Sequence, residues 1–242
     1  MVYVATCAGK HHDISEDAVL VGTEVLIDTS DILPVPDYGF ICVADGVGGN
    51  AGGAQASAFV LGELASASEE ETDDLRKLLL KTNQMLIERS RNDPVAPKMA
   101  TTLTGVYFNG SLSRLVHVGN TRAFARQGDY LKQITSDHTT YNLLKSSGQL
   151  EAANACNKSE ITNCFGGGDP ALLSRVSVCD LPPFSLLLLT SDGVHEYVDI
   201  DELEEILRGN STFAEKCKLI LERAIETGSE DDMTVVIVCP KE

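Results

Sequence analysis

Two Asp-Gly pairs near the ends of apolar runs are the residues in this sequence best suited to bind a metal. Asp45-Gly46 follows the run 40–44, and Asp192-Gly193 comes shortly after the run 185–189. A lone Asp-Gly pair usually marks a tight turn. Because the same arrangement occurs at two predicted buried strands, it favours a metal site. The strand would fix the carboxylate, and the glycine would let a backbone carbonyl approach the same ion.

Two further acidic pairs complete the pattern. Asp231-Asp232 lies just before the apolar run 235–238, and Glu16-Asp17 lies near the start of the chain. Three of the four acidic sites flank apolar runs, which predicts one carboxylate cluster assembled from distant parts of a sheet core. Ligands that are all oxygen suit hard divalent cations such as Mg²⁺ or Mn²⁺ rather than zinc.

Six short motifs in a fixed order carry a family resemblance. They are Glu16-Asp17, Asp45-Gly46-Val-Gly-Gly49, Met99-Ala-Thr-Thr102, Val118-Gly-Asn-Thr-Arg122, Thr190-Ser-Asp-Gly193 and Gly228-Ser-Glu-Asp-Asp-Met-Thr234. In this order and spacing the chain resembles the metal-dependent Ser/Thr protein phosphatases of type 2C, in their short bacterial form. The resemblance runs from about Gly9 to Val238. Each motif alone is a weak signal, and the ordered set is a strong one.

The resemblance implies hydrolysis of phosphoserine and phosphothreonine in proteins by a hydroxide held between two divalent cations, Mn²⁺ or Mg²⁺. Asp45 would bridge both cations, Asp192 and Asp231 would hold one of them, and no protein nucleophile would be needed. Glu16 and Asp17 would act mainly through bound water. The complete set of metal ligands implied is Glu16, Asp17, Asp45, Gly46, Asp192 and Asp231.

Four positions depart from the family pattern. His12 stands where the family has a phosphate-clamping arginine, and we expect His12 to replace it partly, as a phosphate donor or as an acid. An equally weighted alternative makes His12 a surface residue with no role. Val47 replaces a histidine of the animal members that bacterial members commonly lack. Asn120 replaces an aspartate that helps to hold a third metal, and Asp232 replaces a preferred asparagine.

The resemblance also implies an α+β fold, a four-layer α/β/β/α sandwich of two antiparallel sheets with helices on both outer faces. With 242 residues and no apparent linker, we expect a single type 2C phosphatase domain over residues 1–242. The hydrophobic pattern predicts one strand over residues 19–27, a turn-rich loop over 28–37 and a helix from 136 to about 147. It also predicts a strand over 172–178, after an aperiodic segment, 149–168, where the family has a mobile flap.

Composition restricts the classes of binding partner and the cellular compartment that we expect for this protein. The net charge of −17 argues against nucleic acid as a partner, because phosphate backbones would be repelled. The seven scattered cysteines include no close-spaced pair and fit free thiols in a reducing cytoplasm. No basic-then-apolar leader and no apolar run of membrane length is present. We therefore expect a cytoplasmic monomer that contacts no membrane.

Other functions remain open from the sequence. The substitutions at His12, Val47 and Asn120 would also suit a catalytically weak or inactive phosphatase fold that serves as a binding module. The third hypothesis is that the protein is a two-metal hydrolase of small phosphoesters or nucleotides. If the protein is a protein phosphatase, its partner would be a phosphorylated protein. It could be a bacterial Ser/Thr kinase or its targets, or a partner-switching protein of the anti-anti-sigma kind.

Overall fold

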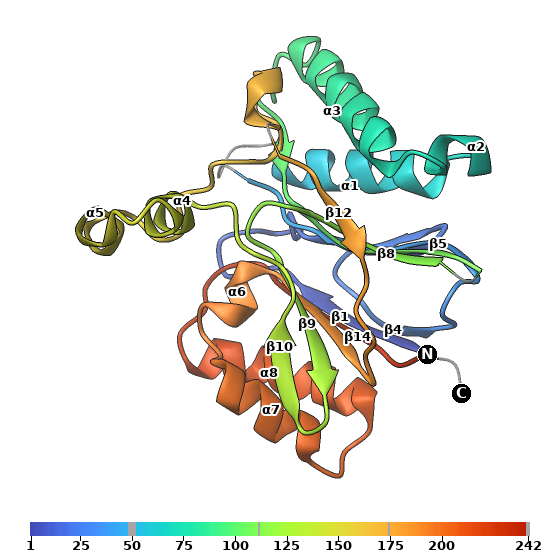
Figure 1. The fold of residues 1–242 in the computed structure, drawn as a ribbon, viewed down its shortest axis with the longest axis vertical. Helices are drawn as coiled ribbons and strands as arrows, with labels where there is room; N and C mark the ends of the chain where they lie inside the picture. Colours follow the sequence, from blue (N-terminus) through green and yellow to red (C-terminus); the bar gives the residue numbers. More distant parts are fainter. Residues whose placement is uncertain (48–51, 111, 174, 241–242) are drawn as a thin grey trace.

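Two six-stranded antiparallel sheets form the centre of the computed structural model, which describes residues 1–47, 52–110, 112–173 and 175–240 (Figure 1). The first sheet has the order β10-β9-β13-β14-β1-β4, with β1 Val2–Cys7, β4 Ser30–Leu33, β9 Arg122–Gln127, β10 Tyr130–Gln133, β13 Leu187–Thr190 and β14 Met233–Val238. The second has the order β12-β8-β7-β5-β2-β3, with β2 Ala18–Gly22, β3 Glu24–Leu26, β5 Tyr38–Ala44, β7 Leu103–Asn109, β8 Leu112–Val118 and β12 Ser177–Asp180. A short pair, β6 Ala100–Thr101 and β11 Phe165–Gly166, lies beside them.

Helices cover the outer face of each sheet (Figure 1). The second sheet is covered by α1 Gly53–Ala65 and α3 Leu75–Arg91, with the short α2 Glu69–Thr72 between them. The first sheet is covered by α6 Asp192–His195, α7 Ile200–Arg208 and α8 Phe213–Glu226. The predicted four-layer α/β/β/α sandwich is therefore confirmed. None of the described helices is long and apolar enough to span a membrane.

Strand periodicity produces the layering. In β5, Ile41 and Val43 face the other sheet, whereas Phe40 and Cys42 pack beneath the helices of their own sheet. Successive side chains of a strand point to opposite faces, so an uninterrupted apolar run fills two cores at once. The N-terminal ends of α7 and α8 are also set by local sequence. Asp199 and Thr212 each form a capping box with the glutamate three residues later.

Two predictions near the N-terminus, one of a strand and one of a loop, were wrong. Residues 19–27 form a hairpin rather than one strand, because Gly22 takes a φ of 63° and lets the chain reverse. The predicted loop 28–37 contains the edge strand β4, which pairs with β1. Half of β4 is polar and exposed, as edge strands often are, so its sequence gives little strand signal.

Two further boundaries also differ. The helix predicted from residue 136 begins only at α4 Thr140–Ser146, where Thr139 caps it. Asp137 does not enter this helix, because its carboxylate binds the guanidinium of Arg122, with Nη2 2.6 Å from Oδ2. The predicted strand 172–178 is a short 3₁₀ turn, Pro170–Leu172, followed by β12.

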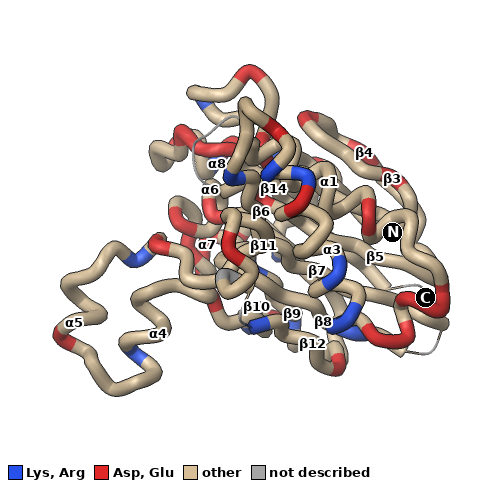
Figure 2. The backbone as a smooth tube through the Cα atoms, turned by 90° about the horizontal axis from the view of Figure 1, so that it is seen from above, with Lys and Arg blue, Asp and Glu red and all other residues tan. Residues whose placement is uncertain are grey.

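The segment predicted to be a flap projects from the body of the molecule (Figures 1 and 2). Within the predicted flap, 149–168, lies a helix that the sequence did not indicate, α5 Leu150–Ala155. The projecting part also includes α4, which precedes the predicted flap. None of the residues of α4 is buried. We use the name flap for residues 139–163, which leave the body after β10 and return to it before β11.

Candidate active site

The predicted acidic residues meet where strands of both sheets begin or end. Asp17 precedes β2 and Asp45 follows β5, and these strands pair so that Ala18 lies opposite Ala44. Asp192 and Asp231 flank the paired strands β13 and β14 of the other sheet. Each of the other three carboxylates raises the pKa of Asp45, which requires short distances between them. The two sheets thus place four carboxylates in one cluster.

The backbone of Asp45 is held by the loop before β7. The Thr102 N–H donates to the Asp45 carbonyl at 2.8 Å, and the Thr102 hydroxyl accepts from the Asp45 N–H at 3.1 Å. The Thr101 hydroxyl donates to the same carbonyl at 2.9 Å. These three bonds fix the direction in which the Asp45 carboxylate leaves the strand end.

Asp45 and Asp192 lie close enough for each to shift the pKa of the other. Burial, followed by the charge of Asp192, raises the pKa of Asp45 well above its usual range. Burial, followed by the charge of Asp231, raises the pKa of Asp192 to about 6. The Asn120 side chain donates Nδ2–H to Asp192 Oδ2 at 2.8 Å and holds that carboxylate in place. Without a cation, the pair retains a proton at a pH where ordinary aspartates have lost theirs.

Asp17 is the most deeply buried of the acids, at 1% exposure. Neither of its carboxylate oxygens reaches hydrogen-bond geometry with a described residue, although the Ser191 and Thr234 hydroxyls lie close enough to lower its pKa in part. Burial outweighs them and raises the pKa of Asp17 well above its usual range. A buried carboxylate without a donor is costly unless a cation or a proton compensates it.

Glycines bring Glu16 against the loop after β5. A Cβ on Gly53 would lie 2.5 Å from the Glu16 carboxylate, and a Cβ on Gly46 would lie 2.5 Å from the Gly53 backbone. The Gly46 N–H donates to the Glu16 carbonyl at 3.2 Å, and the Gly53 N–H donates to the Glu16 carboxylate. Burial raises the pKa of Glu16. Only glycine allows this close approach of Glu16 to the start of α1.

Asp232 ties the N-terminal loop to the cluster. Its Oδ1 accepts from the Gly9 N–H at 2.7 Å, and its Oδ2 accepts from the Glu16 N–H at 2.6 Å. The same Oδ2 contacts His12 Nδ1 at 2.9 Å. This hydrogen bond raises the pKa of His12, so Nδ1–H donates to Asp232. Asp231 is exposed, and its Oδ1 accepts from the Asp232 N–H.

The donor set fits divalent cations. Among the described residues, no three acidic, cysteine or histidine side chains already converge on one point at ligand distance. The raised pKa values of Asp45 and Asp192 instead favour a proton on this pair, and the Asp17 oxygens have no hydrogen-bond partner among the described residues. Divalent cations would replace that proton and pair with the Asp17 oxygens. Because the donors are all oxygens, Mg²⁺ and Mn²⁺ fit better than softer metals.

The structure therefore brings together five predicted acids, Glu16, Asp17, Asp45, Asp192 and Asp231, with Gly46 beside them. Sequence reasoning missed three features. They are the hydrogen bond from Asn120 to Asp192, the clamp of Thr102 on Asp45 and the anchoring of three groups by Asp232. The motifs contained all three residues, but spacing alone does not reveal which atoms meet.

Residues 31–234 match the sequence model of the family described as Protein phosphatase 2C. This stretch contains five of the six predicted motifs, all those from Asp45 onward, and most of the sandwich. The chain belongs to the protein phosphatase 2C family. The resemblance drawn from the motifs is thus confirmed.

Characterised relatives cover most of the chain. The serine/threonine phosphatase stp of Listeria monocytogenes is 29% identical over 209 residues, which are 82% of this chain and 83% of the relative. The serine/threonine protein phosphatase PstP of Mycobacterium tuberculosis is 31% identical over 207 residues, 81% of this chain but 39% of that protein. Members of the family that share this core are therefore named as phosphatases of protein serine and threonine.

Solved structures show the same fold. The crystal structure of the Mycobacterium tuberculosis serine/threonine phosphatase PstP/Ppp superposes with a TM-score of 0.80 at 25% identity, covering 100% of this chain and 99% of that one. The structure of Stp1 from Staphylococcus aureus also gives a TM-score of 0.80, at 24% identity, with 100% and 95% covered. The paired sheets with their outer helices thus form a fold that these structures share.

Proposed function

We propose that this chain removes phosphate from phosphoserine and phosphothreonine in proteins, using two divalent cations, Mn²⁺ or Mg²⁺. The observation that carries the proposal is the cluster of the buried Asp17 with the half-buried Asp45 and Asp192, whose carboxyl groups lack compensating cationic side chains among the described residues. Such a cluster is unfavourable in itself and becomes favourable once cations bind. The family membership supports the same activity.

The residues predicted as metal ligands from the motifs would hold the cations. Asp45 would contact both, with the Gly46 carbonyl on one and Asp192 and Asp231 on the other, while Glu16 and Asp17 would contribute through water. When bound, the two cations would supply an activated water and neutralise charge on the phosphoryl oxygens.

The chain's own residues orient this chemistry. Asn120 holds Asp192, and Thr102 holds Asp45, so the two carboxylates keep fixed directions. His12 uses Nδ1–H on Asp232, which leaves Nε2 for a phosphoryl oxygen or the leaving oxygen of the substrate. His12 is one-third exposed, as a group that meets substrate must be.

A cavity of about 670 Å³ beside the cluster would receive the protein substrate. Asn120, His195 and Glu196 form its wall near the cluster, and Tyr141 and Lys158 form its wall on the flap. The cavity is more than half polar, which suits an extended peptide better than an apolar small molecule. This choice of substrate is tested by measuring phosphate release. Release from a phosphothreonine peptide is compared with release from a panel of nucleotides and small phosphoesters.

We further propose that the substrates are phosphorylated by a bacterial Ser/Thr kinase and that the protein acts as a monomer in the cytoplasm. All seven cysteines are free in the structure, which agrees with a reducing compartment. Loss of phosphate from a kinase of this type, or from its targets, on addition of the protein would support the proposed partner.

We expect Mn²⁺ to stabilise the protein, and to do so more strongly as pH rises. The raised pKa values of Asp17, Asp45 and Asp192 mean that these groups stabilise the metal-free fold below the pKa of an unfolded aspartate. That contribution is lost as pH rises through the folded pKa, about 6 for Asp192. Cations replace the protons, so the gain in Tm should exceed ~5 °C near pH 8 and fall to less than half of that near pH 5.5.

Thermal unfolding with Mn²⁺ and with chelator, at both pH values, measures this difference. Groups outside the cluster contribute equally to both samples and cancel. A Tm gain that is the same at both pH values would contradict proton release from the cluster.

We expect His12→Ala to lower kcat/KM for a phosphothreonine peptide by about tenfold or more, because a donor to the phosphate or the leaving oxygen is lost. His11→Ala is the matched control, since His11 is the adjacent residue, is 70% exposed and pairs only with Glu230 among the described residues. If both variants behave like the wild type, His12 is a surface residue without a role.

A further inference from the structure

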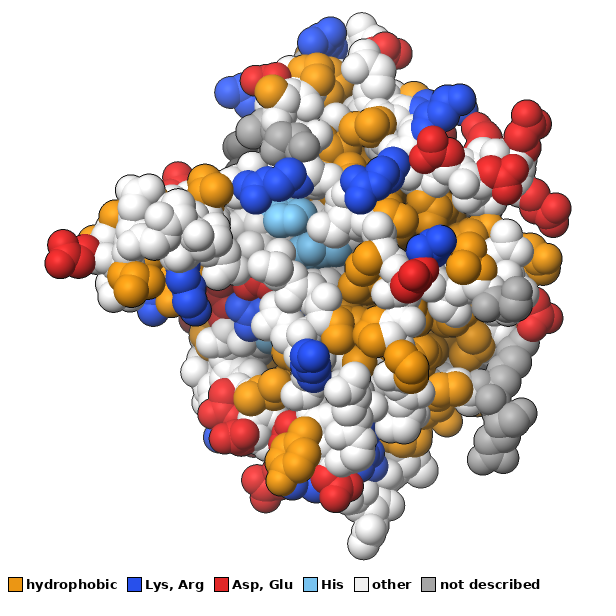
Figure 3. All heavy atoms as spheres, viewed as in Figure 1, with side chains coloured by type: hydrophobic (Ala, Val, Ile, Leu, Met, Phe, Trp, Pro, Cys, Tyr) orange, Lys and Arg blue, Asp and Glu red, His pale blue; other side chains and the backbone are white. Residues whose placement is uncertain are grey.

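A second cavity, of about 530 Å³, lies where the flap joins the body. We call it the hinge cavity. Asn142 and Ser146 of the flap form one side, and Arg76 of α3 and Arg175 before β12 form the other. Its wall includes part of the segment 136–142, which also lines the first cavity. Figure 3 shows basic side chains beside a histidine surface on this face of the molecule.

The two arginines of the hinge cavity make no ion pair with any described carboxylate. This is unusual in a chain with a net charge of −17, where acidic partners are abundant. Arg76 donates Nη1–H to the Val176 carbonyl at 2.5 Å, which holds it at the cavity edge without neutralising it. The acid in the wall, Asp137, is already bound to Arg122. The cavity therefore presents two uncompensated guanidinium groups.

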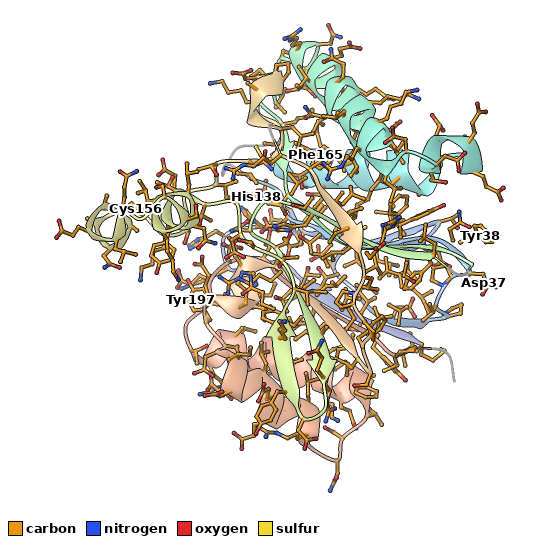
Figure 4. All side chains as sticks on the ribbon, viewed as in Figure 1. Asp37, Tyr38, His138, Cys156, Phe165 and Tyr197 are labelled. Carbon is orange, nitrogen blue, oxygen red and sulfur yellow. The ribbon has the colours of Figure 1, made fainter. Side chains whose placement is uncertain are left out.

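His138 adds a hydrogen-bond donor to the wall of the hinge cavity. Its Nδ1 accepts from the Gly119 N–H at 3.1 Å and from Asn163 Nδ2–H at 2.8 Å, so the ring hydrogen sits on Nε2. No described residue accepts from Nε2, although the side chain is only 9% exposed and lines the cavity. Figure 4 places His138 where the flap meets the body. The ring also packs against His117, at 4.7 Å between centroids, which fixes its orientation.

The environment keeps His138 a neutral donor. Burial, the neighbouring His117 and then Arg175 lower the pKa of His138 to about 4. The contribution of Arg175 also shows that its charge lies near the ring.

We propose that the hinge cavity is a second anion site, which takes a phosphoryl group between the guanidinium groups of Arg76 and Arg175 and the Nε2–H of His138. Planar guanidinium groups bind phosphate oxygens in pairs, and a neutral N–H can satisfy a remaining oxygen. The phosphoryl group comes either from a second phosphorylated residue of the substrate or from free inorganic phosphate. Because the site joins flap and body, its occupation would hold the flap against the body.

Inorganic phosphate is the first probe, added to the Mg²⁺-loaded full chain labelled with ¹⁵N. We expect the His138 Nε2 resonance to shift along one saturable curve. In Arg76→Gln/Arg175→Gln the same resonance should require about 100-fold more phosphate, because each lost guanidinium weakens binding about tenfold. Arg91→Gln, an exposed arginine of the same helix outside the cavity, should leave the curve unchanged. No saturable shift, or the same curve in the double variant, would overturn the proposal.

Peptides then separate the two sources. If the substrate supplies the group, the double variant raises KM for a doubly phosphorylated peptide and leaves KM for the singly phosphorylated one unchanged. If free phosphate is the ligand, the variant loses the resonance shift and leaves both KM values unchanged. Only this peptide comparison rests on the proposed phosphatase function. The resonance reports binding without catalysis, so failure of the second site and failure of the activity are distinguishable.

Discussion

Asp45→Asn is expected to abolish turnover and, at the same time, to stabilise the metal-free protein. Asp45 interacts with Asp17, Asp192 and Asp231, so its loss should lower kcat by about 10³-fold or more. The raised pKa of Asp45 means that its ionisation opposes folding as pH rises. Near pH 8 in chelator, the variant should therefore gain about 1–3 kcal/mol in free energy of unfolding.

Urea unfolding near pH 8 and near pH 4.5, together with peptide dephosphorylation, checks both effects. The stabilisation should vanish near pH 4.5, where Asp45 is protonated in the wild type. Asp129→Asn, at a position 79% exposed and distant from the cluster, is the control and should change neither quantity. Retained turnover, or destabilisation near pH 8, would refute the role of Asp45 as a metal ligand.

Asp232→Ala is expected to be the most damaging change to stability in the cluster. The Asp232 side chain is 5% exposed and accepts from two backbone N–H groups and from His12. Removing it leaves these half-buried donors without their acceptor, and we expect a loss of about 3–5 kcal/mol in free energy of unfolding. Glu16 would also lose its position, so the midpoint for Mn²⁺ activation should rise.

Urea unfolding of the Mn²⁺-loaded protein measures the change. Asp180→Ala removes a carboxylate that is 81% exposed and pairs with Arg114, and it should cost less than about 1 kcal/mol. Asp232→Asn retains one acceptor oxygen and should lie between the two. A loss below about 1 kcal/mol for Asp232→Ala would show that the N-terminal loop is held by other contacts.

The sequence predicted those parts of the fold where local signals are strong. The apolar runs around Ile41 and Leu188 mark buried strands, as the structure confirms. It failed where tertiary contacts decide the outcome. β4 exists because β1 offers it an edge, and α4 starts late because Asp137 is drawn to Arg122. Neither contact leaves a pattern in the chain.

The site shows the same division. The carboxylates could be predicted as metal ligands because each follows or precedes an apolar run and together they match the motifs of a family. The role of Asp232 could not be predicted from the sequence, because its three hydrogen-bond donors belong to residues more than 200 positions away in the chain. The hinge cavity was equally invisible, because Arg76, His138 and Arg175 belong to no common motif.

Metal dependence of peptide dephosphorylation tests the central claim most directly. The wild-type chain is assayed on a phosphothreonine peptide after chelation and after stepwise return of Mn²⁺ or Mg²⁺, with bound metal measured in parallel. We predict no turnover after chelation and full recovery as two cations bind per chain. Undiminished turnover in chelator, or uptake of two cations without any turnover, would contradict the assignment of this cluster as a two-cation phosphatase centre.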